Sequence, residues 1–276
     1  MSRFRYEMTE QKIEQWIKEG RGKGEGKNYK PFLTVFDFSS DGSVNRNPGV
    51  KTGRTEHVFS QNEEWTLSVA SLSVGIVDIN EQFPLLPLEE TIEIARLLSI
   101  KHPVFQDHTL KKEVTVVLTT DFCFTIQLPN GEKGRVARTV KMNSDLSSYR
   151  TIEKLEIERV YWKSRNVDWG IIIADILPKY FVKNCMDLIP FYLFDPLNIP
   201  HEDVSEIFNY LTPVVLLKKQ SLRLIAKDCD NHFGLKRGTS IKACRHFVAT
   251  QKWVVNLNQL LDPSEILEIQ SASENY

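Results

Sequence analysis

The sequence predicts an α/β fold in which helices cover a mixed sheet, followed by a mostly helical tail. The run 113–126 is rich in Val, Thr and Phe, and a Pro-Asn-Gly turn joins it to a second strand at 135–141. A helical pattern at 150–165 then leads to the short apolar strand 170–174. Strands that alternate with helices in this order favour a sheet with helices on its faces.

The tail differs from this pattern, which predicts two domains, 1–175 and 176–276. Helical periodicity is expected at 177–190, 202–218 and 219–229, and a strand is expected at 253–257.

Composition limits the function. The 276 residues are 41% apolar and 26% charged, as in a folded soluble protein, and no apolar run is long enough for a membrane span. The four scattered cysteines suit a reducing cytoplasm. The net charge of −1 is low for a protein that holds DNA alone, because neutralising phosphates supplies most non-specific affinity. If DNA is the ligand, we expect partner proteins to help bring the chain to it.

Two basic segments lie near the N-terminus. A helix expected at 9–19 ends at a glycine-rich loop, which does not match a phosphate-binding P-loop and does not follow a strand. The loop is either a flexible basic segment or a segment whose cations and amides follow a DNA backbone. A second basic turn lies at 51–54. The candidate DNA contacts from both segments are Arg21, Lys23, Lys27, Lys30, Lys51 and Arg54.

The intervening elements are predicted from local pattern alone. His57, with no identifiable serine or cysteine partner, is expected to be structural. The expected elements are a strand at 31–38, a polar turn at 39–47, a buried strand at 74–79, a connector at 80–87 and a helix at 88–99.

Glu63 has two compatible interpretations. Ser60 and Glu63 have the spacing of a capping box, in which the glutamate reaches back to the amide of Ser60. A helix N-terminus is also a favourable place for a carboxylate that binds a cation. Spacing alone favours the cap.

Asp121 interrupts the most strand-like run of the chain. An isolated buried charge is very costly, so this carboxylate is expected either to be satisfied by hydrogen bonds or to hold a cation. Alternation along the next strand places Thr139 and Lys141 on one face, so Lys141 can stand beside Asp121. Two carboxylates and an ammonium are the groups that a magnesium-dependent nuclease uses at a scissile phosphate, although an ordinary solvated lysine fits the spacing too.

Two further patterns are interpreted conservatively. The charges of helix 150–165, including Lys154 and Glu158, are expected to form a solvated face. Cys229 and His232 with Cys244 and His246 resemble a zinc set, but the one-residue gap of the second pair is too short for a usual zinc finger and favours strand alternation.

Several uncommon strings resemble the TnsA family, the endonuclease subunits of heteromeric bacterial transposases. The resemblance covers most of residues 10–165 and is weaker in the tail. It is carried by the glycine-rich loop, Lys51-Thr52-Gly53-Arg54, Ser60-x-x-Glu63, Asp78-Ile79-x-Glu81-Gln82-Phe83-Pro84-Leu85-Leu86-Pro87, Ile100-Lys101-His102-Pro103, Thr120-Asp121-Phe122 and Glu153-Lys154-Leu155-Glu156.

The resemblance implies a restriction-endonuclease-like catalytic core and a winged-helix-like tail that docks on the AAA+ regulator TnsC. Glu63, Asp121 and Lys141 would be the catalytic residues, and the Val140 carbonyl a further metal ligand. Thr139 is also a candidate metal ligand, but it stands where the family often has Gln or Glu. In this position the sequence departs from the family pattern, and a threonine hydroxyl is a shorter and weaker ligand. The implied cofactor is Mg²⁺, with Mn²⁺ as a substitute.

The implied reaction is hydrolysis of the 5′ strand at each end of a transposon, in the bacterial cytoplasm and at the nucleoid when active. The partners would be the transposase TnsB, TnsC and transposon-end DNA. The alternatives are a non-catalytic adaptor between TnsB and TnsC, which the intact acid–lysine set disfavours, and a stand-alone restriction or repair nuclease, which the low net charge disfavours.

Overall fold

The computed structural model describes residues 9–37, 45–107, 110–193 and 201–273. Contacts divide the chain into two compact units, the first comprising residues 1–70 and 75–176 and the second 71–74 and 177–276. The boundary in the chain therefore falls between Ile176 and Leu177, next to the predicted one between 175 and 176.

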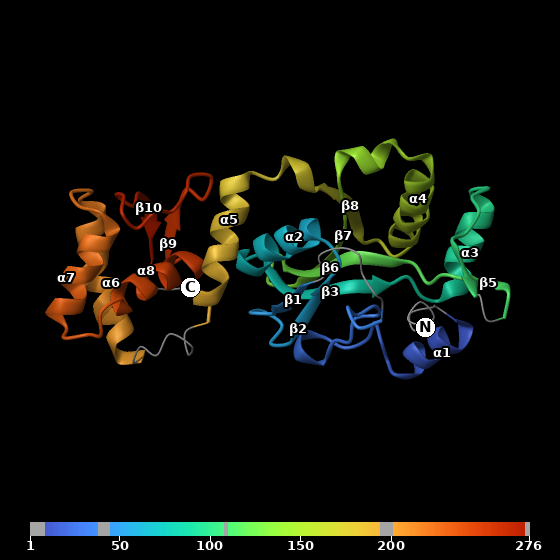
Figure 1. Cartoon of the computed structure of the whole chain (residues 1–276), viewed down its shortest axis with the longest axis horizontal. Helices are drawn as coiled ribbons and strands as arrows, with labels where there is room; N and C mark the ends of the chain where they lie inside the picture. The colour runs from blue at the N-terminus through green and yellow to red at the C-terminus, as the bar shows by residue number, and fades with distance from the viewer. Residues whose placement is uncertain (1–8, 38–44, 108–109, 194–200, 274–276) are drawn as a thin grey trace. The chain divides into compact units, whose positions relative to one another are not determined.

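The first unit is built on a four-stranded mixed sheet of order β3-β6-β7-β8. The β3/β6 and β6/β7 pairs are antiparallel, whereas β7 and β8 are parallel. Parallel neighbours need a crossover, and α4 supplies it between β7 and β8 (Figure 1). The elements of this unit are α1 (Glu10–Lys18), β1 (Asn45–Pro48), β2 (Thr55–Val58), α2 (Gln61–Leu72), β3 (Ile76–Pro84), α3 (Leu88–Leu97), β4 (Val104–Asp107), β5 (Lys112–Thr115), β6 (Thr119–Gln127), β7 (Lys133–Lys141), α4 (Tyr149–Ser164) and β8 (Asp168–Ile173).

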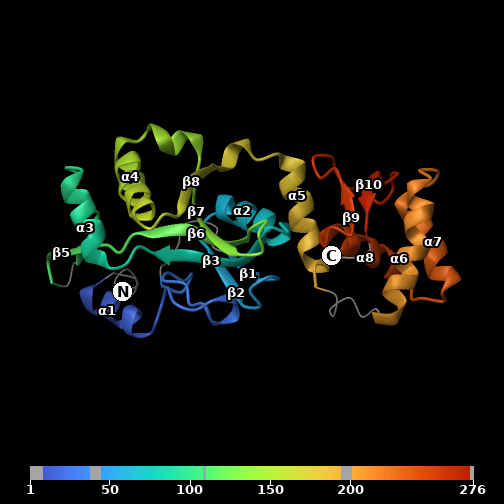
Figure 2. The ribbon, with the colours of Figure 1, turned by 180° about the vertical axis from the view of Figure 1, so that it is seen from behind.

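Helices pack on both faces of the sheet, as the alternation of its strands requires. Phe124 packs in one apolar cluster with Leu67 of α2, whereas its neighbour Cys123 packs in another with Ile157 of α4. Figures 1 and 2 show α1, β1 and β2 beyond the β3 edge of the sheet, on the side away from β8. The predicted α/β class with a mixed-sheet core is confirmed and is consistent with a restriction-endonuclease-like fold.

Three local expectations were wrong. The segment 31–37 forms turns rather than a strand, because the Asp37 carboxylate accepts hydrogen bonds from the amide and hydroxyl of Thr34, both at 2.7 Å. Residues 38–44, the rest of that strand and most of the polar turn, lie outside the described part. The connector expected at 80–87 is mostly strand, since β3 continues to Pro84, and the run 113–126 is split between β5 and β6.

The second unit is mostly helical. Trp253 of β9 is fully buried between Phe208 and Phe247, with ring centroids 6.3 and 5.2 Å away. Its elements are α5 (Lys179–Leu188), α6 (His201–Leu216), α7 (Leu222–His232), α8 (Thr239–Ala249), β9 (Trp253–Val255) and β10 (Ile269–Ala272), and β9 pairs antiparallel with β10. The helix α8 was not predicted. These helices confirm the mostly helical tail that we expected.

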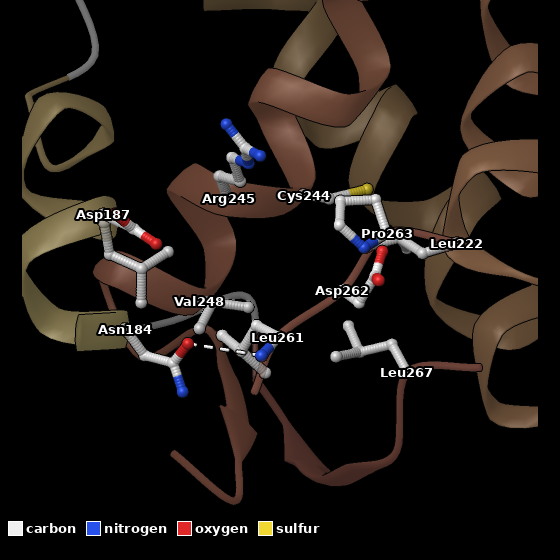
Figure 3. Close-up of a pocket in the computed structure, with 11 residues that line it drawn as sticks. Asn184, Asp187, Leu222, Cys244, Arg245, Val248, Leu261, Asp262, Pro263 and Leu267 are labelled. Atoms are coloured by element: carbon white, nitrogen blue, oxygen red, sulfur yellow. Dashed lines mark hydrogen bonds between the residues drawn. The ribbon is translucent and has the colours of Figure 1, made fainter. Parts of the chain in front are cut away.

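A small apolar cavity of about 60 Å³ lies inside this second unit (Figure 3). Asn184 stands at its wall, where its amide nitrogen donates to the carbonyls of Leu257 and Gln259 and its oxygen accepts from the amide of Leu261 at 3.2 Å. These bonds fix the segment that follows β9 against α5. Among the described residues, no helix is both long and apolar enough to cross a membrane.

Candidate active site

Glu63 lies in the first turn of α2 and is 9% exposed. Its amide donates to the Ser60 hydroxyl at 3.2 Å, as in the predicted capping box. Its carboxylate reaches back to the amide of Phe59 at 3.0 Å, one residue before the expected Ser60 amide, and accepts from the Ser60 hydroxyl at 2.9 Å. Gln82 of β3 donates a further bond to it at 3.3 Å. Capping therefore holds the carboxylate in place without removing it from the site.

Asp121 lies at a fork in the sheet. The described pairing of β6 with β7 ends at Phe122 and Arg138, while β6 stays paired with β3 as far as Thr119 and β7 with β8 as far as Lys141. The Asp121 carboxylate fills the gap, because it accepts a hydrogen bond from the amide of Val140 at 2.7 Å. A side chain thus replaces the backbone partner that the strand would otherwise provide.

Lys141 stands beside Asp121, as the alternation predicted. Its Nζ lies 3.6 Å from the Asp121 carboxylate and donates to the Val140 carbonyl at 2.8 Å. The two side chains are 26% and 15% exposed, so both remain accessible to solvent. The fork therefore presents a carboxylate, an ammonium and a backbone carbonyl at one point.

The electrostatics link Glu63 to this fork. Burial, and after it the negative charge of Asp121, raise the pKa of Glu63 to about 7, although the bonds from Phe59 and Ser60 and the charge of Lys141 oppose the shift. Burial and the nearby Asp121 charge disfavour the ionised form of Glu63 in the absence of a cation. The two carboxylates together provide oxygen ligands, which suit a hard divalent ion.

Thr139 faces a different partner. Its hydroxyl donates to the carboxylate of Glu158 on α4, which also accepts from the Thr120 hydroxyl at 2.5 Å. Thr120 in turn accepts from the indole nitrogen of Trp162 at 2.7 Å. Glu158 therefore links β6 to β7 through two hydrogen bonds where the backbone pairing of these strands ends. The hydroxyl of Thr139 is used in one of these two bonds.

The expectation that Glu158 belongs to a solvated face was wrong, since it is only 6% exposed. Burial raises its pKa to about 7, although the bonds from Thr120 and Thr139 oppose that shift. Sequence reasoning missed it as a site residue. The available signal was its helical spacing, three residues after Leu155 and four before Trp162, both of which are buried.

Of the six basic candidates for DNA contact, three are at least partly buried and bonded within the protein, and three are exposed. Arg21 is bound to Asp37 at 2.6 Å, and Arg54 forms a bidentate pair with the fully buried Glu81 at 2.6 and 2.5 Å. These guanidinium groups anchor the loops around them. Lys51 is half-buried and donates to the carbonyl of Ile76. The remaining three, Lys23, Lys27 and Lys30, are exposed.

The zinc interpretation finds no support in the described residues, which contain no cluster of three or more His, Cys, Asp or Glu side chains able to hold a metal. His232 stacks on Tyr210 with ring centroids 4.7 Å apart, and His246 Nδ1 lies 2.8 Å from the Phe191 carbonyl. His57 is buried, as expected of a structural residue.

The comparisons with known proteins agree with this geometry. Residues 74–174 match the family described as TnsA-like endonuclease N terminal, and residues 177–257 match TnsA endonuclease C terminal. The chain is 33% identical over 254 residues to the Transposon Tn7 transposition protein TnsA of Escherichia coli, covering 90% of this chain and 87% of that protein. The chain belongs to the TnsA family. It is therefore an endonuclease subunit of a Tn7-like transposition system, and Asp121, Lys141 and Glu158 lie within the first matched region.

The raised pKa of Glu63 predicts how stability depends on pH in the absence of divalent metal. A folded-state pKa above the unfolded value means that the native state binds more protons, so the free energy of unfolding decreases as pH rises from about 4.5 to about 7 and then levels off. In Glu63→Gln, the decrease in the free energy of unfolding between pH 5 and pH 8 should be smaller than in the wild type by roughly 1–3 kcal/mol. Urea unfolding at pH 5 and pH 8 in EDTA measures it, with the exposed Glu14→Gln as control. If the free energy of unfolding of Glu63→Gln decreases with pH as much as that of the wild type, Glu63 does not have the raised pKa.

Proposed function

We propose that this TnsA-family chain is a Mg²⁺-dependent endonuclease that cuts the 5′ strands at transposon ends, together with TnsB and TnsC. The observation that carries the proposal is the contact of Lys141 with Asp121 at the fork, beside a Glu63 carboxylate whose pKa is raised by burial and by Asp121. The stand-alone nuclease and the non-catalytic adaptor remain the rival functions.

The donor set at the fork fits a magnesium ion. Glu63, Asp121 and the Val140 carbonyl are the groups that would hold it, with Mn²⁺ as a substitute, whereas the hydroxyl of Thr139 already donates to Glu158. Bound there, the ion would polarise the scissile phosphate and lower the pKa of a water molecule.

The chain's own residues have distinct roles in this proposal. Lys141, close to Asp121, orients the attacking water and offsets the negative charge that develops on the phosphate. Asp121 keeps the Val140 amide satisfied while its second oxygen remains for the ion. Glu158 touches none of the reacting atoms and acts as a positioning residue, because it joins Thr120 to Thr139 beneath the fork.

The low net charge of the chain fits a complex in which a partner protein, rather than this chain, recognises the DNA ends. With a net charge of −1, the protein is expected to bind DNA weakly at physiological salt, so TnsB would supply recognition of the transposon ends. The second unit contains none of the fork residues, and we propose that it docks on TnsC.

Dependence on partners is the test that separates the rival functions. With Mg²⁺, the purified chain should leave an end-labelled transposon-end duplex largely intact, and 5′-strand cleavage should appear when TnsB and TnsC are added. The assay is a denaturing gel of both strands. Robust nicking by the chain alone, on any sequence, would favour the stand-alone nuclease. Normal transposition with no 5′ cut attributable to this chain would favour the adaptor.

A further inference from the structure

The first unit has a basic hollow at the turn end of the β6–β7 hairpin, well away from the fork. Its volume is about 470 Å³, and four cationic side chains line it: Lys27, Lys51, Lys133 and Arg135. We propose that this hollow binds a backbone phosphate of the DNA on one flank of the cleavage site. The inference rests on the proposed nuclease function and adds Lys133 and Arg135, which were not among the six basic candidates.

The hairpin directs the two new cations to one side. Lys133 and Arg135 are two residues apart on β7, so they share a face of the sheet, and both are exposed. Gly134, between them, faces Ile126 and Leu128 on the other side. Arg135 pairs in register with Thr125, which in turn pairs with Asp78 of β3. Three adjacent strands therefore form the floor of the hollow.

The opposite wall is held in place by hydrogen bonds. The amide of Gly26 donates to the Asp78 carboxylate at 2.9 Å, and the Gly26 carbonyl accepts from Arg54 at 3.2 Å. These bonds fix the backbone next to Lys27. Lys51 is anchored through its ammonium to the carbonyl of Ile76. Because the backbone positions of these cations are set before a ligand arrives, less conformational entropy is lost on binding.

The charges in the hollow favour an anion. The two acidic residues in its lining are both engaged: Asp78 accepts the amides of Gly26 and Ile79, each at 2.9 Å, and Glu25 lies 3.6 Å from Arg135 with 76% of its side chain exposed. Burial lowers the pKa of Lys51 to about 8, a cost that a bound phosphate would offset. Four cations against two acids make this a positive site on a chain whose net charge is −1.

The position along the sheet suits a DNA flank. Thr125, at the hollow, and Asp121, at the fork, are four residues apart on β6, which corresponds to ~13 Å along a strand. A DNA strand carries one phosphate per ~3.4 Å of helix axis, so for a duplex whose axis follows β6 this separation equals about four nucleotides. A contact at that distance would fix the register of the duplex without touching the reacting phosphate.

The test measures how binding of the full chain to a 40-base-pair duplex depends on salt, in EDTA so that no cleavage occurs. Each phosphate contact contributes a slope of about −0.9 to log K against log salt, so loss of the one proposed contact in Lys133→Gln/Arg135→Gln should make the slope shallower by about 1. The control is Lys154→Gln/Lys163→Gln, which removes the same charge from two exposed lysines of α4 and should change the slope by much less than one unit. Circular dichroism confirms that each variant is folded.

The outcomes are separable from those of the nuclease proposal. An unchanged slope in the hairpin variant, an equal loss in the α4 variant, or no DNA binding by the wild type at low salt would overturn the phosphate site. The proposal would also be overturned if the hairpin variant lost binding of inorganic phosphate but bound DNA normally. The ligand of the hollow would then be free phosphate and not DNA. If the hairpin variant loses slope as expected but neutralising Asp121 leaves cleavage intact, the phosphate site stands and the nuclease assignment fails.

Discussion

Asp121→Asn will abolish 5′-strand cleavage while leaving the protein folded. The carboxylate is the one group at the fork that touches both the Val140 amide, at 2.7 Å, and Lys141, at 3.6 Å, among the described residues. Asparagine keeps an oxygen that can accept from the Val140 amide but loses the charge that would hold a divalent cation. A metal contribution of several kcal/mol to the transition state corresponds to a loss of about 10³-fold or more in rate.

The choice of asparagine matters because of the fork. Alanine would leave the Val140 amide without its acceptor, at a cost of about 1–3 kcal/mol, and would confuse a folding defect with a catalytic one. The measurement is the single-turnover cleavage rate of an end-labelled duplex with TnsB, TnsC and Mg²⁺. Asp168→Asn, which alters a largely exposed carboxylate paired with Arg138 on the same sheet, is the control and should retain most activity. A wild-type rate in Asp121→Asn would refute the catalytic assignment.

Removing the Glu158 carboxylate will have the second-largest effect. In Glu158→Ala the hydroxyls of Thr120 and Thr139 lose their shared acceptor, and the fork loses the tie between β6 and β7. Groups that orient metal ligands typically change activity by about 10–100-fold, and we expect a loss of that size. We also expect destabilisation, because two buried polar groups are left unsatisfied.

Glu158→Gln separates the positioning role from mere stability. Its amide oxygen can still accept from both threonines, so it should restore most of the cleavage rate, whereas Glu156→Ala on the exposed side of α4 should change little. The decisive readout is the Mg²⁺ concentration for half-maximal cleavage, which should rise in Glu158→Ala and return towards the wild-type value in Glu158→Gln. If Glu158→Ala is less stable but keeps a wild-type magnesium dependence, the residue is only structural.

Local sequence determined several features because short-range interactions decide them. The spacing of Ser60 and Glu63 produced the cap, and Asn130-Gly131 in the turn joined β6 to β7 in a register that brings Lys141 to Asp121. The helix predicted at 150–165 is α4 at 149–164, because its apolar periodicity is long and regular. The acid–lysine set of the candidate site could therefore be named from the sequence.

Only the tertiary structure decided the rest. The segment 31–37 has strand propensity, but a distant arginine, Arg21, and the local Asp37 turn override it. The end of the β6–β7 pairing at the fork was not predictable from local pattern, because there the Asp121 carboxylate accepts the hydrogen bond of the Val140 amide in place of a backbone partner. Helical periodicity places the charged residue Glu158 of α4 in the core. Its burial is possible because the hydroxyls of Thr120 on β6 and Thr139 on β7 donate hydrogen bonds to its carboxylate. Burial and pairing of charges are long-range properties, so a local pattern can identify the candidate catalytic acids but not the buried Glu158 carboxylate beside them.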